Sequence, residues 1–393
     1  MHDLLLAAEV ALSLLLLTCS GLLTRSFVLQ RQVDLGIRGD NLLTTRISLS
    51  SLQYRSAGSQ ARFLRALLNR LGADRGVVAA GISTDIPPYS VLNTKFDIPG
   101  AGHPNSWSGH IAASSSQWFA TVGSRLMAGR VLTVADENAR RRVVVINHTL
   151  AEKYFGARNP IGQLLHVDAL NMTAEPIRDP WFEIVGIISD IRNEGTRKDV
   201  LPEAYLPYTI EAFGGYTVFV RTLGKAEAMV PDLAATVLAS GSGVTPQYTW
   251  SMERILELNE YSRPRFFMIL VAVFAVIGLA RVSVGIYSVI FYRLLQRRKE
   301  IGIRMALGAT AGTIRLNIIA VSLRSAYVGA GLGIAVALML SHIVASQIWG
   351  VVWYDPVTLG GVLLLLSVVE FSAAYAASVR VSRVAPVICL RDE

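Results

Sequence analysis

Residues 297–309 read RRKEIGIRMALGA, a short basic segment between two long apolar runs. Ile301, Met305 and Gly308 recur at the spacing of one helix face, while arginine and lysine occupy the other sides. Gly308 is also a residue type at which helices commonly end. A segment with this much charge does not cross a bilayer, so we expect it to lie along the membrane surface. The alternative is a solvated loop whose charge marks the cytoplasmic side.

Apolar runs long enough to cross a membrane flank this segment and recur elsewhere. The chain has 393 residues, 52% hydrophobic and 17% charged, against about 25% charged in an average soluble protein. A helix of roughly 20 apolar residues crosses the hydrocarbon core. We predict four such spans, at residues 4–23, 266–292, 318–343 and 357–379. The polar block at 25–264 is long enough for one or two folded domains.

The basic residues beside the spans predict the orientation of the chain. The loop after the second span carries six of them, opposed only by Glu300: Arg293, Arg297, Arg298, Lys299, Arg304 and Arg315. The loop after the third span has Asp355 and no lysine or arginine. The positive-inside rule places the loop after the second span in the cytoplasm and the loop after the third span outside. Because the block at 25–264 precedes the second span, it lies on the opposite side from the cytoplasmic loop, which is outside. Because much of the net charge of +8 lies beside spans, we expect no nucleic-acid partner.

The two cysteines give the exported block no disulfide. Cys19 lies in the first span and Cys389 in the tail, so the block at 25–264 must be stabilised by its core. The run Leu-Leu-Thr-Cys at residues 16–19 faintly resembles a lipoprotein cleavage box. A basic segment before it is missing, and we therefore predict an uncleaved span.

Two strand–helix–strand patterns organise the exported block. The first has strands at 42–49 and 77–86 around a helix at 57–72, and the second has strands at 216–222 and 247–250 around a helix at 225–238. Short strands and turns fill the region between them, from about residue 93 to residue 208. The pattern predicts one mixed α/β domain, made of two split βαβ units with a β-rich inserted lobe.

Charged residues and a glycine pair are notable inside the predicted spans. Arg281 lies near the middle of the second span and Glu370 near the middle of the fourth, where a charge costs about 3 kcal/mol. We expect them to pair with each other, to pair across a subunit interface, or to face a wet cavity. Glu9 is expected to reach the membrane surface or to pair with a cation on another span. Gly329 and Gly333 form a small-xxx-small pattern typical of close helix packing.

Known catalytic and cofactor motifs are missing from the sequence. It contains no G-x-x-x-x-G-K-[ST], H-E-x-x-H or G-x-S-x-G motif, so we expect no catalytic residue and no ATP site on this chain. Four histidines lack neighbouring ligand residues at metal-binding spacing and are predicted to lie at the surface: His103, His110, His148 and His166. We therefore expect neither a metal site nor a bound cofactor.

The segment at 297–309 resembles the cytoplasmic loop of the FtsX/MacB family of ABC-transporter permeases, of the form R-x-R/K-E-I-G-I-R-x-A-L-G-A. Further phrases follow in the family's order: WF at 118–119, GR at 129–130, VVVIN at 143–147, YF at 154–155, NPIG at 159–162, EIVG at 183–186 and PEAYLP at 202–207. The tail departs from the family pattern at Ala377, Val379 and Ala385. The likeness is to macrolide-exporter-like permeases, in particular to one half of the duplicated orphan permeases of acidobacteria. The first span begins almost at Met1, so a fragment or half-permease is also an expectation.

The resemblance implies a non-catalytic permease subunit in a bacterial inner membrane, multi-pass, with its large domain in the periplasm. In this family a separate ABC ATPase carries the ATP and docks on the cytoplasmic loop. The corresponding residues here are Arg298, Lys299, Glu300, Ile301, Arg304 and Met305. The resemblance also implies a homodimer or pseudo-dimer, contact with lipid and a periplasmic adaptor. ATP hydrolysis would then move the external domain in efflux or mechanotransmission.

The predicted fold is an α-helical membrane protein with four transmembrane helices and a large extracytoplasmic mixed α/β domain. Its parts are residues 1–24 as the first helix, 25–264 as the MacB-like core domain and 265–393 as the FtsX-like permease domain. An alternative function is an orphan membrane scaffold or signalling protein that regulates an envelope partner without transport. A membrane-anchored enzyme is the weakest alternative, since no catalytic set is visible. The substrate is not indicated.

Overall fold

The computed structural model describes residues 2–49, 52–99, 107–172, 176–241, 243–296, 331–335, 348–352 and 354–382. The chain divides into two compact units, which are the globular unit Val33–Glu260 and the helical unit Met1–Gln32 with Tyr261–Glu393. The basic segment at 297–309 lies outside the described residues, as does the predicted span at 318–343 apart from residues 331–335.

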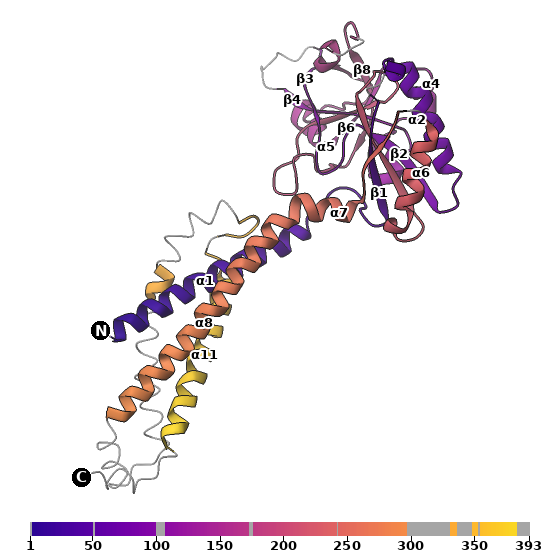
Figure 1. Ribbon diagram of the computed structural model, residues 1–393. Coiled ribbons are helices and arrows are strands. Elements are labelled where there is room, and N and C mark those ends of the chain that lie inside the picture. Colours follow the sequence, from indigo (N-terminus) through magenta and orange to yellow (C-terminus); the bar gives the residue numbers. More distant parts are fainter. Residues whose placement is uncertain are drawn as a thin grey trace, which may run out of the picture. The chain divides into compact units, whose positions relative to one another are not determined.

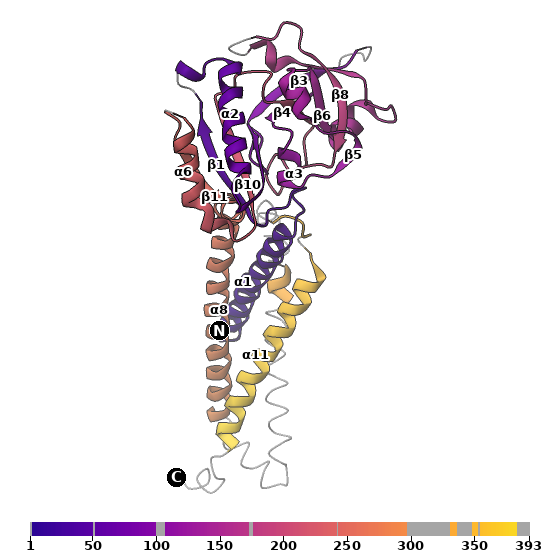
Figure 2. The ribbon, with the colours of Figure 1, turned by 90° about the vertical axis from the view of Figure 1, so that its right-hand side faces the viewer.

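A four-stranded antiparallel sheet forms one half of the globular unit. Its strands, in spatial order, are β11 (Pro246–Ser251), β1 (Leu42–Ser48), β10 (Gly215–Thr222) and β2 (Val77–Ser83). Helix α2 (Ala57–Gly72) connects β1 to β2, and α6 (Val230–Ser240) lies between β10 and β11. Figure 2 shows the two helices beside these strands. This is a split βαβ arrangement with the two units interleaved in one sheet.

Helix α2 forms where its sequence is amphipathic and capped. The Ser56 side chain accepts a hydrogen bond from the backbone N–H of Ser59, which satisfies a donor at the helix start. Phe63, Leu64 and Leu67 are buried on one face of the helix. They join a single apolar core that also contains side chains of the sheet and of the inserted strands. Burial of this face, rather than helix propensity alone, therefore holds α2 on the sheet.

Gly81 of β2 allows a second layer to pack on the other face of the sheet. A Cβ atom at this position would lie 2.5 Å from Cα of Trp118, which starts the short helix α3 (Trp118–Val122). The Trp118 ring packs edge-on against Phe219, the partner of Gly81 across the strand pair. Only glycine leaves room for this close backbone approach.

The inserted strands close into a six-stranded ring. In order around the ring they are β3 (Leu92–Asp97), β4 (Ser108–Ser114), β9 (Glu203–Pro207), β6 (Val143–Asn147), β8 (Trp181–Ile188) and β7 (Leu164–Val167). Strand β5 (Leu126–Gly129) pairs with β8, and β2 joins β4 through Ser83 and Ser114. Because each of the six strands pairs with two other strands of the ring, this lobe is a small barrel filled by side chains.

Short helices connect the strands of the globular unit. They are η1 (Leu52–Tyr54), α4 (Val134–Asn138), α5 (His148–Leu150), η2 (Ala151–Phe155), η3 (Asp168–Met172), η4 (Ala226–Met229) and α7 (Met252–Leu256). Helix α7 is followed directly by the π-helical turn η5 (Glu257–Tyr261). The last residue of that turn already belongs to the helical unit.

The helical unit is built from α1 (His2–Arg31), α8 (Ser262–Gln296) and α11 (Pro356–Ser382) (Figure 1). Among the described residues three helices are long and apolar enough to cross a membrane: Ala8–Arg31, Met252–Tyr292 and Pro356–Ala376. Residues 331–335, inside the predicted span at 318–343, are also helical. Four transmembrane helices therefore remain a prediction.

Small residues bring α1 close to its neighbours in the helical unit. A Cβ atom at Gly278 of α8 would lie 3.0 Å from the Ser13 hydroxyl oxygen. At Gly333 it would lie 2.9 Å from the Ala11 Cα, and at Gly21 2.6 Å from the Thr358 methyl group (Cγ2). These contacts show close helix packing at Gly333, one member of the predicted small-xxx-small pair.

Candidate functional site

The residues predicted to dock an ATPase lie outside the part of the chain that the structure describes. They are Arg298, Lys299, Glu300, Ile301, Arg304 and Met305. The geometry available for a functional site therefore comes from the helical unit around Arg281 and Glu370, and from the polar interior of the globular unit.

Arg281 of α8 forms an ion pair with Glu9 of α1. Its Nη2 atom lies 3.1 Å from Glu9 Oε1, and the two side chains are 73% and 24% exposed. Glu9 thus pairs with a cation on another span, one of the two roles expected for it. A direct pair between Arg281 and Glu370 was one expectation. In the structure the Arg281 guanidinium pairs instead with the Glu9 carboxylate of α1.

Glu370 lies on the packed face of α11. It is only 2% exposed, and its helix neighbours Leu366 and Ala374 belong to the apolar core between α1, α8 and α11. Its Oε1 atom has no hydrogen-bond partner among the described residues. Glu370 therefore faces protein, as expected for a carboxyl group at this depth.

Asp355 caps the start of α11 and ties it to α1. Its Oδ2 atom accepts hydrogen bonds from the Thr358 backbone N–H at 2.9 Å and from the Thr358 hydroxyl at 2.6 Å. The same carboxylate forms an ion pair with Arg25 of α1. A carboxylate at this position satisfies free N–H groups of the helix start and complements its dipole.

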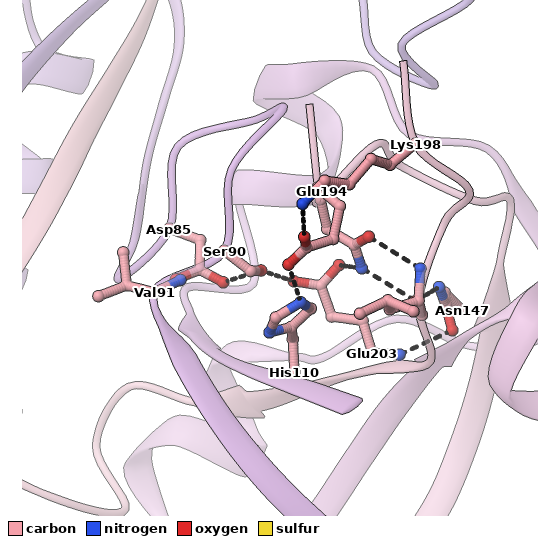
Figure 3. A network of polar contacts seen from close by, with 10 residues as sticks. Asp85, Ser90, Val91, His110, Asn147, Glu194, Lys198 and Glu203 are labelled. Atoms are coloured by element: carbon pink, nitrogen blue, oxygen red, sulfur yellow. Dashed lines mark hydrogen bonds and ion pairs between the residues drawn. The ribbon is translucent and has the colours of Figure 1, made fainter. Parts of the chain in front are cut away.

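A network of buried polar groups lies where the sheet meets the ring (Figure 3). Asp85 follows the end of β2, Ser90 lies in the loop before β3, and Glu203 starts β9. Asp85 is 4% exposed and Glu203 2% exposed. The Ser90 Oγ atom lies 2.5 Å from Asp85 Oδ2 and 2.6 Å from Glu203 Oε1, so the hydroxyl bridges the two carboxyl groups.

This bridge requires a shared proton. A serine hydroxyl has one hydrogen to donate, so one of the two carboxyl groups must itself donate to Ser90. The second oxygen of Glu203, Oε2, already accepts from Asn193 Nδ2 at 3.1 Å and from the Tyr205 hydroxyl at 2.8 Å. Burial, and then the charge of Glu203, raise the pKa of Asp85 well above its ordinary value. Asp85 is therefore the protonated member of the pair.

Two asparagines fix the backbone around this carboxyl pair. Asn147, at the end of β6, accepts from the backbone N–H of Glu203 and of Leu150, and donates to the carbonyl of Leu201. Asn193 donates to the same carbonyl and accepts from the Leu201 N–H. A buried network with this many satisfied groups specifies one arrangement of its loops.

His110 joins the network through Glu194 and corrects an expectation. It was expected at the surface, but β4 buries it to 2% exposure, and its Nε2 atom lies 3.0 Å from Glu194 Oε1. Lys198 binds the other oxygen of Glu194 at 2.9 Å, and this hydrogen bond is the main cause that lowers the pKa of Glu194. The carboxylate partner lies 84 residues along the chain, which local spacing does not reveal.

The network has the chemistry of a structural connection. His110 binds Glu194 rather than Ser90, so among the residues that the structure describes no histidine is seen to bind that hydroxyl and activate it as a nucleophile. Over the described residues no group of three or more His, Cys, Asp or Glu side chains could hold a metal ion. The sequence patterns did not single out Asp85 or Ser90 as site residues, and they contained Glu203 only within the PEAYLP phrase. The available signal was a carboxylate directly after a buried strand.

Comparison with known proteins identifies the family. The model of the MacB-like periplasmic core domain matches residues 11–239, and that of the FtsX-like permease C-terminal domain matches residues 272–386. The first of these covers more than half of the chain.

Curated relatives are about a quarter identical to this chain over the region that aligns. The macrolide export ATP-binding/permease protein MacB 2 of Aeromonas hydrophila is 27% identical over 251 residues, which are 61% of this chain and 37% of the relative. The probable syringafactin export ATP-binding/permease protein SyfD of Pseudomonas syringae pv. tomato is 27% identical over 255 residues, 61% of this chain and 36% of the relative. The chain thus spans about a third of the length of these relatives.

Two solved structures are also similar to part of this chain. The periplasmic region of MacB from Actinobacillus actinomycetemcomitans has 16% identity and a TM-score of 0.37, over 57% of this chain and 94% of that chain. The extracellular domain of the ABC-type transporter YknZ from Gram-positive bacteria has 17% identity and a TM-score of 0.32, over 55% and 94%. The family matches and the apolar helices fit an inner-membrane protein with a periplasmic domain. The chain belongs to the family of FtsX-like ABC-transporter permeases that carry a MacB-like periplasmic core domain.

Proposed function

We propose that this chain is the permease subunit of an ABC-type efflux or mechanotransmission system. ATP hydrolysis by a separate ATPase moves the periplasmic domain, and this chain itself binds no ATP. The observation that carries the proposal is the match of one chain to both a MacB-like periplasmic core domain and an FtsX-like permease domain. The proposal places ATP binding outside these 393 residues, in which no P-loop motif occurs.

The proposed membrane topology has four helices, with the third at residues 318–343. The helix at residues 1–24 precedes the periplasmic domain at 25–264, and the permease domain occupies residues 265–393. Two permeases form a homodimer or a pseudo-dimer, and a periplasmic adaptor is a further proposed partner. The basic residues beside the second span support a cytoplasmic position for the loop that follows it.

The segment at 297–309 is the proposed docking site for the ATPase. Arg298, Lys299 and Arg304 supply charge, and Ile301 and Met305 supply an apolar face at helical spacing. Glu300 and Arg304 are four residues apart, which is the spacing of a stabilising pair on a helix. A short helix of this kind can insert into a groove of a partner and pass on its movement.

The test is co-purification of the tagged full-length chain from its native membranes in mild detergent. We expect Glu300→Lys to abolish recovery of the ATPase, because it reverses the acidic residue of the segment and loses the pair with Arg304. Glu253→Lys is the matched control, since Glu253 is exposed on α7, outside the proposed docking segment. Both variants should reach the membrane in normal amounts. Undiminished ATPase recovery with Glu300→Lys would overturn the docking assignment.

A further inference from the structure

Glu260 holds two separate loops of the globular unit together. The Tyr89 hydroxyl donates to Glu260 Oε1 at 2.5 Å, and the Thr196 backbone N–H donates to Oε2 at 3.1 Å. The Thr196 hydroxyl binds the same Oε2 atom. Burial, and then the hydrogen bond to Glu260, raise the pKa of Tyr89, so its hydroxyl stays protonated as a donor. One carboxylate therefore accepts from both loops through charge-assisted hydrogen bonds.

The two loops also pair with each other through their backbones. The Gly195 N–H donates to the Pro88 carbonyl at 2.7 Å, and the Ser90 N–H donates to the Asn193 carbonyl at 3.0 Å. Gly195 adopts a φ of +86°, and a Cβ atom there would lie 3.2 Å from Glu260 Oε1. The backbone conformation that brings the second loop to the carboxylate thus favours glycine.

The paired loops lead directly into the buried network and the ring. Ser90 bridges Asp85 and Glu203, and Asn193 binds Glu203 at the start of β9. One loop connects β2 to β3, and the other connects β8 to β9. Three of these four strands belong to the ring. A displacement of Glu260 is therefore resisted by hydrogen-bonded groups that lead into the ring strands.

Both ends of the globular unit contact the segment at residues 190–196. At the N-terminal end the Arg192 N–H donates to the Leu35 carbonyl at 3.0 Å. Gly36 has a φ of +74° and approaches so closely that a Cβ atom would lie 2.0 Å from the Asp190 carbonyl oxygen. At the C-terminal end Glu260 binds Thr196, and α8 begins two residues later, at Ser262. The chain thus enters and leaves this unit beside one short segment.

We propose that Glu260 is a positioning residue that transmits movement of the membrane helix α8 to the six-stranded ring through the loops at 84–91 and 190–203. This role rests on the proposed function, because it needs a system in which the membrane helices move. Glu260 is suited to it by sequence position, as the last residue of the globular unit. The helical segments α7, η5 and α8 follow one another along the chain without an intervening non-helical residue, and this continuous backbone is the proposed route from α8 to Glu260.

The first test measures hydrogen–deuterium exchange of the full-length chain in lipid nanodiscs. Glu260→Ala should speed exchange in peptides covering 84–91 and 190–203 by about tenfold, which corresponds to about 1.4 kcal/mol. Tyr89→Phe combined with Thr196→Val removes the two hydroxyl donors, leaves the Thr196 backbone N–H in place, and should speed exchange in the same peptides. The exposed α7 variant Glu253→Ala should leave both loops unchanged. Unchanged exchange in both the Glu260 and the Tyr89/Thr196 variants would overturn the proposal.

The second test uses the complex with its co-purified ATPase. ATP with vanadate should change exchange in the ring strands of the wild-type complex. In Glu260→Ala the ATPase should remain bound and active, while the change in the ring is lost. An equal change in Glu260→Ala would overturn the transmitting role. Failure to recover any ATPase would instead contradict the proposed function, and with it transmission, whereas the first test would still decide whether Glu260 holds the loops.

Discussion

At the scale of single residues, the bridge between Asp85, Ser90 and Glu203 shows how one proton determines the structure of a buried site. Two carboxyl groups within hydrogen-bond distance of one hydroxyl cannot both be ionised without repulsion. Asp85 therefore takes up a proton when the domain folds. The free energy of folding therefore depends on pH through Asp85, although an aspartate side chain does not titrate near neutral pH in an unfolded chain.

Asp85→Asn should stabilise the periplasmic domain at neutral pH. Asparagine can donate to Ser90 and accept from the Val91 N–H, as protonated Asp85 does, without taking up a proton. Because the folded pKa of Asp85 is raised, the contribution of this residue to stability is fully present below about pH 4 and falls as pH rises, by at most about 1.4 kcal/mol per pH unit. The advantage of the variant should thus grow from pH 4 to pH 7.

The measurement is the thermal unfolding midpoint of the full-length protein across that pH range. Asp199→Asn serves as the control, since Asp199 is exposed. Its midpoint should track the wild type at every pH. If the unfolding midpoints of Asp85→Asn and the wild type differed by the same amount from pH 4 to pH 7, this would contradict a protonated Asp85.

The pair of Arg281 and Glu9 permits a second prediction at this scale. Glu9→Arg or Arg281→Glu alone places two like charges side by side within the apolar helices, where each charge costs about 3 kcal/mol. Either change should lower the yield of folded protein in detergent. The double variant Glu9→Arg with Arg281→Glu should restore most of it, as measured by gel filtration. A double variant no better than the singles would argue against a direct pair.

The sequence contained a usable signal for this pair. Glu9 lies 16 residues before Arg25, and Arg281 lies 16 residues after Arg265. Both are therefore about 24 Å along their helices from these arginines. The contacts of Glu9 with Arg281 and of Ser13 with Gly278 show that α1 and α8 run antiparallel. A cation on another span was an expected partner for Glu9. Its identity could not be predicted, because a comparison of depths in the membrane requires knowing which helices are neighbours.

At the scale of elements, strands and helices with strong local patterns were predictable. The helix expected at 57–72 is α2 (Ala57–Gly72), and the strand expected at 42–49 is β1 (Leu42–Ser48). Alternating apolar residues and a capping serine encode both within a few positions. Closure of the ring was not predicted, because β4 pairs with β9 and β3 with β7 across long sequence separations. The buried carboxyl pair was missed for the same reason.

Gly81→Ala should disrupt the packing of α3 on the sheet. Its new Cβ atom would lie 2.5 Å from the Trp118 Cα, and backbone on both sides prevents easy relaxation. Overpacking of this kind costs about 1–3 kcal/mol. The unfolding midpoint should fall by roughly 2–4 °C per kcal/mol for a domain of this size. Gly224→Ala, which meets no atom within 4 Å, should change it little. Equal midpoints for the two variants would refute the packing argument.

At the scale of the whole molecule, one chain contains both a periplasmic α/β domain and a set of apolar helices. The family matches at residues 11–239 and 272–386 support a permease, and the resemblance of the segment at 297–309 motivates the proposed docking of an ATPase. Composition and the positive-inside rule predicted the membrane class and the orientation. The substrate could not be predicted, because the chemistry visible in the described residues is structural.

Purification of the wild-type chain from native membranes shows whether this permease works with a separate ATPase, as we propose. The tagged chain is extracted in mild detergent, and its companions are identified and quantified by mass spectrometry. We expect to recover an ABC ATPase in a ratio near one to one with the permease. Recovery of the chain alone, or with an envelope enzyme in place of the ATPase, would contradict it and favour a scaffold or signalling role.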